Sequence, residues 1–233
     1  MSNPSPSASE RRSFLARINA GAATVAALAM GGIAMAQVKS PATTRWTPAR
    51  HEKDDWMDEL PGKHRLIFDT IGSEGLGQAL LFANNFMRVN QTDYGLENSD
   101  LAVIIVVRHR STAFGYSDGM WAKYGPALAA RARFEDPKTK TPPKTNLFNS
   151  EGYGELLPSM GTTMESLSKQ GVQFAVCSAA THAMAGSIAG PGGDADAVFR
   201  ELTSNLVKNA RMVPAGIVAL NRAQERGYSL VSP

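Results

Sequence analysis

The chain contains one cysteine, Cys177, whose position in the sequence could make it reactive. It closes an apolar run at 172–177 that is typical of a strand, and the following residues favour a helix that begins near Ser178–Thr181. N–H groups and the dipole at a helix N-terminus stabilise a thiolate. A thiolate at this point could attack sulfane sulfur and carry it as a persulfide. The alternative interpretation is an inert, buried strand residue, which is common for free cysteines.

Basic residues follow a second apolar run and could bring positive charge to the same place. Leu101–Val107 is continuous and β-branched, which is typical of a strand buried on both faces. Arg108, His109 and Arg110 come directly after it. Because the carboxyl ends of parallel strands meet at one edge of a sheet, these side chains should gather near Cys177 and attract an anionic sulfur compound. We therefore expect an activated thiolate, although a solvated strand end would also explain the basic residues.

Two further residues are candidates for substrate binding at this edge. His182 lies in the first turn of the helix after Cys177, where it could orient or protonate the sulfur or share a metal ion with it. A partly buried histidine that bonds to the backbone is the more common situation. Gly216 follows a short predicted strand at 210–213 and opens a helix. The glycine-rich stretch 72–77 favours a tight turn, because it matches neither the dinucleotide nor the P-loop pattern. No GxSxG elbow supports a hydrolase.

Strands and helices alternate along the chain from residue 64. The predicted strands are 64–70, 101–107, 172–177, 210–213 and 228–231. The predicted helices are 75–91, 117–124 with an extension toward 133, a helix marked by Met160, Met164 and Leu167, then 181–189, 194–209 and 216–227. This order implies right-handed βαβ crossovers. We predict an α/β fold with three layers, in which helices cover both faces of a mostly parallel sheet of about five strands.

Two segments depart from this alternation. Residues 134–158 are rich in lysine and proline and form a predicted insertion, which is unusually long for a loop in a compact domain. It could be a lid, an oligomer arm or a mobile segment, and a solvated insertion is the favoured interpretation. Residues 37–63 form a predicted N-terminal extension, with a short helix at 54–60. The α/β domain would then span 64–233.

The first 36 residues have the features of an export signal. Arg11 and Arg12 precede a weakly apolar run at 20–36, which is rich in alanine and glycine and ends in a small-x-small cleavage site. The run is short and weakly apolar for a membrane span, which needs about 20 strongly apolar residues. We predict a twin-arginine (Tat) signal peptide that the Tat translocase recognises and that is cleaved after Ala36. The protein would then be periplasmic or secreted. An ordinary secretory signal or an N-terminal anchor is the alternative.

Composition excludes several classes of protein. A single cysteine cannot form an intrachain disulfide or supply a Cys-ligated cluster. The chain has 24 basic and 21 acidic residues, a net charge of +3. The first 36 residues hold three of the basic and one of the acidic residues, so the remainder carries only +1. Such a balance gives no support for nucleic-acid binding. We predict no cofactor. A metal ion or haem near Cys177, His109 or His182 is the alternative.

Two stretches resemble the DsrE/DsrF/TusD-like sulfur-relay family. Residues 171–177 resemble its strand-plus-cysteine segment, and residues 213–228 resemble its closing segment, with a Val-Pro-x-Gly turn, a helix and a Gly-Tyr pair. The helix containing Asn84-Asn85-Phe86 also fits, so the resemblance covers 64–233. It implies a three-layer α/β fold, a homo-oligomer and a persulfide-carrying role for Cys177. The sulfur would come from a small anionic species or a partner sulfur-transfer protein.

The favoured interpretation is therefore an exported protein that binds or relays sulfane sulfur through Cys177. The alternatives are a non-catalytic periplasmic protein that binds a metal or haem, and an oligomerisation module.

Overall fold

The computed structural model describes residues 46–233. The predicted signal peptide at 1–36 and the first part of the predicted extension lie outside the described residues. The chain divides at Thr47 into two units, and the helices and strands of the described residues all belong to the second, Pro48–Pro233. No helix in this part of the chain has the length and apolar character needed to cross a membrane.

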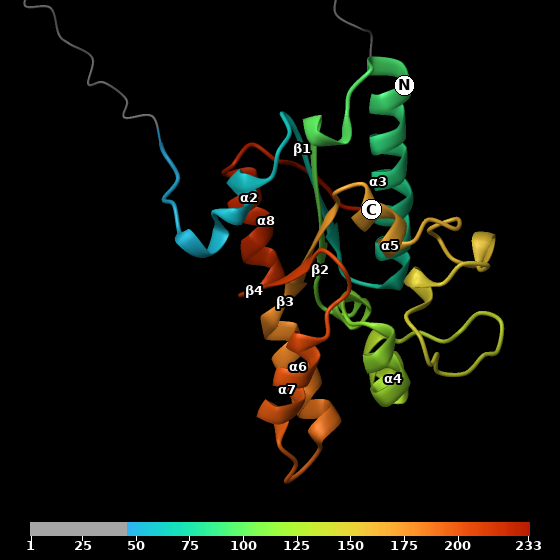
Figure 1. Ribbon diagram of the computed structural model, residues 1–233. Coiled ribbons are helices and arrows are strands. Elements are labelled where there is room, and N and C mark those ends of the chain that lie inside the picture. Colours follow the sequence, from blue (N-terminus) through green and yellow to red (C-terminus); the bar gives the residue numbers. More distant parts are fainter. Residues whose placement is uncertain (1–45) are drawn as a thin grey trace, which may run out of the picture. The chain divides into compact units, whose positions relative to one another are not determined.

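Five parallel strands form one sheet in the order β4-β3-β2-β1-β5 (Figure 1). The strands are β1 His64–Thr70, β2 Leu101–Val107, β3 Gln173–Cys177, β4 Ala210–Val213 and β5 Ser229–Val231. All seven residues of β2, the central strand, are buried, as its continuous apolar sequence predicts. The predicted α/β fold with a parallel sheet of five strands is confirmed.

Helices make the connections between the strands and cover both faces of the sheet (Figure 1). α2 (Trp56–Glu59) precedes β1, and α3 (Ser73–Tyr94) joins β1 to β2. The connection from β2 to β3 contains α4 (Asp118–Ala132) and α5 (Met164–Lys169). α6 (Ser178–Ala189) and α7 (Ala195–Ser204) lie between β3 and β4, and α8 (Gly216–Gln224) joins β4 to β5.

The two faces of the sheet bury separate cores, because successive strand residues point to opposite faces. The larger core packs the strands against α3, α4, α5, α6 and α7, and its buried strand residues are Phe68, Leu101, Val103, Ile105, Val107, Phe174 and Val176. The smaller core packs them against α2 and α8, with Ile67, Ala102, Ile104, Val106, Ala175 and Val213. We call these sides the α3 face and the α8 face. The same alternation assigns Asp69, Arg108 and Cys177 to the α8 face.

Several element boundaries differ from the prediction because tertiary contacts override local pattern. The helix predicted at 194–209 ends at Ser204, since residues 205–207 pair with the chain before α4: Ser117 N–H donates to Asn205 O, and Val207 N–H donates to Gly115 O. A short 3-10 helix at Ser111–Gly115 has no counterpart among the predicted elements. α5 begins only at Met164, because Met160 adopts a left-handed backbone with φ 50°.

Part of the segment 134–158 is packed into the α3 face: residues 146–148 are buried, whereas residues 138–142 are exposed. Phe148 is 1% exposed, and its ring meets Phe114 edge-on with 4.8 Å between centroids. Asn146 is fully buried, and its side-chain amide donates to the carbonyl of Phe114 at 2.7 Å. The favoured interpretation of a solvated insertion is therefore wrong for residues 146–148, whose apolar side chains complete the core around α4, while it holds for the exposed residues 138–142.

The described part of the N-terminal extension is anchored to the α8 face. Trp56 and Met57 of α2 are buried in the smaller core. The Tyr228 hydroxyl donates to the Met57 carbonyl at 2.7 Å, and Arg226 Nε donates to Asp58 at 2.9 Å. These bonds hold the segment before β1 against the end of α8.

Candidate functional site

Cys177 lies at the end of β3, next to a strand whose following helix covers the opposite face of the sheet. β3 continues into α6 on the α3 face, whereas the neighbouring β4 continues into α8 on the other face. In open parallel sheets such a divergence opens a crevice at the carboxyl ends of the strands, where ligands bind. Cys177 pairs in register with Val213, the last residue of β4. Cys177 is thus the last residue of β3, one of the two strands whose ends border this crevice.

The thiol caps the helix that comes after it. Cys177 Sγ accepts a hydrogen bond from the Ala180 N–H at 3.4 Å, and the residue is 6% exposed. The Thr181 hydroxyl donates to the Cys177 carbonyl at 2.9 Å, and the Tyr116 hydroxyl donates to Thr181 Oγ1 at 2.8 Å. Burial raises the pKa of Tyr116 well above its usual range, so the phenol remains a neutral donor. This chain of bonds holds Cys177 in place at the start of α6.

Arg108 lies beside Cys177, and its charge is already paired. Because Val107 is in register with Val176, Arg108 is adjacent to Cys177 on the α8 face. Its Nε and a terminal nitrogen donate to the two carboxylate oxygens of Asp69 at 2.7 and 2.8 Å. This bond to Asp69 raises the pKa of Arg108, and the charge of a Cys177 thiolate acts in the same direction. We call Asp69, Arg108 and Cys177 the cysteine row.

Gly216 allows the N-terminus of α8 to approach this row. A Cβ atom at Gly216 would lie 2.6 Å from Arg108 Cβ and 3.0 Å from Val106 Cγ1, closer than side chains tolerate. The first N–H groups of a helix have no partner within it. The positive end of α8 is therefore held close to Arg108. The sequence indicated that Gly216 opens a helix, but its role as a close-contact glycine depends on how α8 crosses β2.

One residue of the N-terminal extension lines a pocket at the ends of β3 and β4. Lys53 borders a pocket of about 440 Å³ together with Ser178, Met212, Val213 and Pro214. Ser178 is the next residue after Cys177 in the chain. Sequence reasoning assigned no role to Lys53, since nothing local indicates that the segment before β1 packs against the ends of β3 and β4.

His182 lies on α6 but contacts α7. Its ring stacks on Phe199 with 3.7 Å between centroids and an angle of 6° between the planes. The side chain is exposed rather than partly buried, and this stacking occupies one face of the ring. Within residues 46–233, no group of three or more His, Cys, Asp or Glu side chains is placed to hold a metal ion.

His109 and Arg110 line a different pocket from the cysteine. His109 adopts a left-handed backbone with φ 57°, and the Arg110 N–H donates to the Ile71 carbonyl at 3.1 Å. Their pocket, of about 330 Å³, is completed by Ala130, Arg131 and Arg133 at the end of α4. The structure thus separates the predicted trio: Arg108 joins Cys177, and the other two join arginines that sequence reasoning missed.

Comparison with known proteins adds no function. No family model matches the chain, and no curated protein matches it. One similar solved structure is a protein of unknown function from Methanobacterium thermoautotrophicum, with 17% identity and a TM-score of 0.37. The match covers 73% of this chain and 100% of that one.

Proposed function

We propose that this protein carries sulfane sulfur on Cys177 as a persulfide and passes it to an acceptor. The observation that carries the proposal is the position of Cys177 at the strand divergence, at the N-terminus of α6 and beside the Arg108 guanidinium. Helix N–H groups and a neighbouring cation are the features that favour a nucleophilic thiolate. The resemblance of residues 171–177 and 213–228 to sulfur-relay proteins points to the same chemistry.

In the proposed step, the Cys177 thiolate attacks the outer sulfur of an anionic donor, a persulfide or thiosulfate. A new S–S bond forms to Cys177 as the donor's own S–S bond breaks, and the electron pair leaves with a thiolate or with sulfite. Total charge is unchanged, and no external oxidant or reductant is needed. The N–H groups at the start of α6 would stabilise the negative charge of donor and thiolate held together, and the terminal nitrogen of Arg108 that does not bond to Asp69 would add to this.

The surroundings of Cys177 favour a small donor. Cys177 is 6% exposed, and its chain neighbour Ser178 borders the pocket of about 440 Å³ that Lys53 also lines, so we expect the donor to approach from this pocket. Lys53 is exposed and would supply a positive charge at the entrance for an anion. A partner protein could deliver sulfur only through a protruding group that reaches the same pocket.

Intact-mass measurement tests the proposal directly. The purified protein is incubated with a low-molecular-weight persulfide or with thiosulfate. We expect a mass gain of one sulfur atom that a reducing thiol removes, and no gain in Cys177→Ser. A gain that persists in Cys177→Ser, or one that the native protein acquires only after denaturation, would contradict a carrier role.

We also propose that the protein is exported through the Tat route and acts as a homo-oligomer. Ile217 and Val218 on the outer surface of α8 support the second part, since they are 60% and 40% exposed and apolar. N-terminal sequencing of the exported protein should find residue 37 as its first residue. Light scattering should show more than one copy, and a monomer at micromolar concentration would contradict the oligomer.

A further inference from the structure

The pocket at the end of α4 is a concentrated positive site that is independent of the proposed sulfur transfer. His109, Arg110, Ala130, Arg131 and Arg133 line it, and its volume is about 330 Å³. Three of the five are arginines, which stay charged at any physiological pH. No carboxylate is among the lining residues. We call it the arginine pocket.

The charges of this pocket have no partner within residues 46–233. None of the ion pairs or side-chain hydrogen bonds in that range includes Arg110, Arg131 or Arg133. By contrast, Arg108 is bound to Asp69 and Arg226 to Asp58. Arginines grouped around one cavity and left unpaired repel one another, so the pocket is electrostatically suited to an anion.

The C-terminus of α4 explains the presence of only some of the arginines in this pocket. α4 ends at Ala132, and cations in its last turn are stabilised by the helix dipole. That accounts for Arg131 and Arg133 but not for Arg110, which comes from the turn after β2. Two of the lining residues also adopt left-handed backbone that favours glycine, His109 with φ 57° and Arg133 with φ 53°. The fold therefore keeps two ring or guanidinium side chains, those of His109 and Arg133, at positions where glycine would be less strained.

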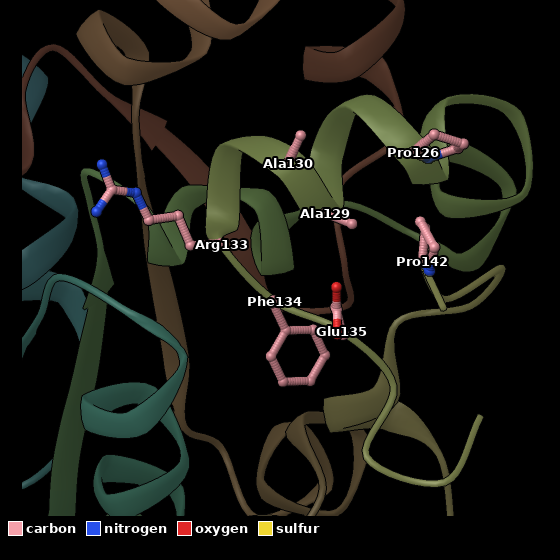
Figure 2. Close-up of a pocket in the computed structure, with 7 residues that line it drawn as sticks. All are labelled: Pro126, Ala129, Ala130, Arg133, Phe134, Glu135 and Pro142. Atoms are coloured by element: carbon pink, nitrogen blue, oxygen red, sulfur yellow. The ribbon is translucent and has the colours of Figure 1, made fainter. Parts of the chain in front are cut away.

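Figure 2 shows how side chains near the end of α4 are directed. Ala130 and Arg133 also border a neighbouring pocket of about 540 Å³, whose other lining residues are Pro126, Ala129, Phe134, Glu135 and Pro142. The Arg133 side chain points away from the rings of Pro126, Phe134 and Pro142 (Figure 2). The Glu135 carboxylate points toward Ala129 rather than toward the Arg133 guanidinium (Figure 2). Glu135, the acid among these lining residues, therefore leaves Arg133 available to a ligand in the arginine pocket.

We propose that the arginine pocket binds a small dianionic oxyanion of the phosphate, sulfate or thiosulfate type. Guanidinium groups donate parallel pairs of hydrogen bonds to such oxygens, which gives both charge and shape recognition. Two or more arginines match the two charges of the anion, and His109 adds a further donor. A monovalent halide can neutralise charge but cannot fill the paired donor positions.

Calorimetric titration tests this with sodium phosphate, sulfate and thiosulfate as probes, at an ionic strength held constant with chloride. We expect saturable one-site binding of at least one dianion and a matching rise in melting temperature, because the ligand binds the native state. If phosphate binds most tightly of the three, the pocket is a phosphate site; if sulfate or thiosulfate does, it is a site for sulfur oxyanions. No saturable binding of any of the three dianions above the constant chloride background would overturn the proposal.

A pair of matched variants isolates the pocket. Arg133→Gly and Lys140→Gly each remove one positive charge at a left-handed residue, with φ 53° and 58°, but only Arg133 lines the pocket. Arg133→Gly should weaken dianion binding roughly tenfold or more, while the unliganded melting temperature is unchanged or raised. Lys140→Gly should leave the affinity unchanged. Equal losses in both variants, or none in Arg133→Gly, would show that no defined site exists there.

The Cys177→Ser protein distinguishes this site from the proposed sulfur site. It should bind the dianion with unchanged affinity, because the cysteine does not line the arginine pocket. If binding disappears in Cys177→Ser, the anion occupies the crevice beside the cysteine and the arginine pocket is not its site. Arg133→Gly should in turn keep sulfur uptake at Cys177.

Discussion

Arg108 and Arg110 are two residues apart in the sequence and end in opposite electrostatic surroundings. Arg108 forms two hydrogen bonds with Asp69 and lies beside Cys177 under the N-terminus of α8. Arg110 lines the arginine pocket without an acidic partner within residues 46–233. The left-handed turn at His109 separates them. The basic residues after β2 therefore belong to two different sites. At one site the charge of Arg108 is paired with Asp69, and at the other the charge of Arg110 has no acidic partner in the described part of the chain.

The cysteine row and the arginine pocket also differ in what holds them. The cysteine row lies on strands β1, β2 and β3 and at their ends, where register determines its spacing. The arginine pocket lies on a turn and on the end of α4, whose side chains pack with the segment 134–158. Changes in that segment should therefore affect the arginine pocket more than the cysteine row, and substitutions in both places test this difference.

We expect the greatest loss of stability from Phe148→Ala. Removing a ring that is 1% exposed and packed edge-on against Phe114 should lower the free energy of unfolding by about 3 to 5 kcal/mol. Dianion binding should weaken, because the support of α4 is lost. Leu156→Ala, in the same segment but 53% exposed, is the control and should change stability little. Denaturant unfolding measures both, and a small loss in Phe148→Ala would restore the interpretation of a solvated insertion.

Gly216→Ala should disturb the cysteine row. The new methyl group would lie 2.6 Å from Arg108 Cβ, and such overpacking costs about 1 to 3 kcal/mol. Gly186→Ala in α6 is the matched control, since no atom lies within 4 Å of its added Cβ. It should stabilise the protein by about 0.4 to 1 kcal/mol. Thermal unfolding of both variants shows whether the close approach of α8 is required, and equal effects would contradict it.

Asp69→Asn tests whether the charge of Arg108 is structural. We expect a loss of about 1 to 2 kcal/mol in unfolding free energy, in the lower part of the range for charged hydrogen bonds because the Arg108 side chain is 26% exposed. Arg110→Gln should change stability by less than about 0.5 kcal/mol, since no acidic partner is lost. Urea unfolding at neutral pH compares them. Similar losses in the two proteins would mean that the two sites do not differ.

A smaller effect is expected from Tyr116→Phe, which removes the bond to Thr181 and should cost about 1 kcal/mol at pH 8. Burial raises the pKa of Tyr116, so the folded protein keeps this phenol protonated where the unfolded chain ionises. Its contribution to the free energy of unfolding is therefore fully present below about pH 10 and is lost as pH rises further.

Urea unfolding from pH 8 to 10.5 should show a steeper fall in the free energy of unfolding for the native protein than for Tyr116→Phe. Burial raises the pKa of Tyr228 to about 12, and this residue affects both proteins alike. Parallel pH profiles would contradict the burial of Tyr116.

Local signals in the sequence were enough to predict the secondary structure that carries the site. Such signals are apolar runs like Leu101–Val107 and the turn residues that separate one run from the next. They were enough to predict the strand positions, the parallel α/β fold and the place of Cys177 at the end of a strand. The end of α7 at Ser204 could not be predicted, because it results from the pairing of residues 205–207 with Gly115 and Ser117, far away in the chain.

Which side chains meet depends instead on how the elements pack. Strand order and register bring Asp69 to Arg108, and the packing of α4 brings Arg131 and Arg133 to His109. The stacking of His182 on Phe199 likewise depends on how α6 and α7 pair. Periodicity specifies the face on which a residue lies, whereas its neighbours across that face come from other segments. Their identity is settled by burial and charge pairing over the whole fold.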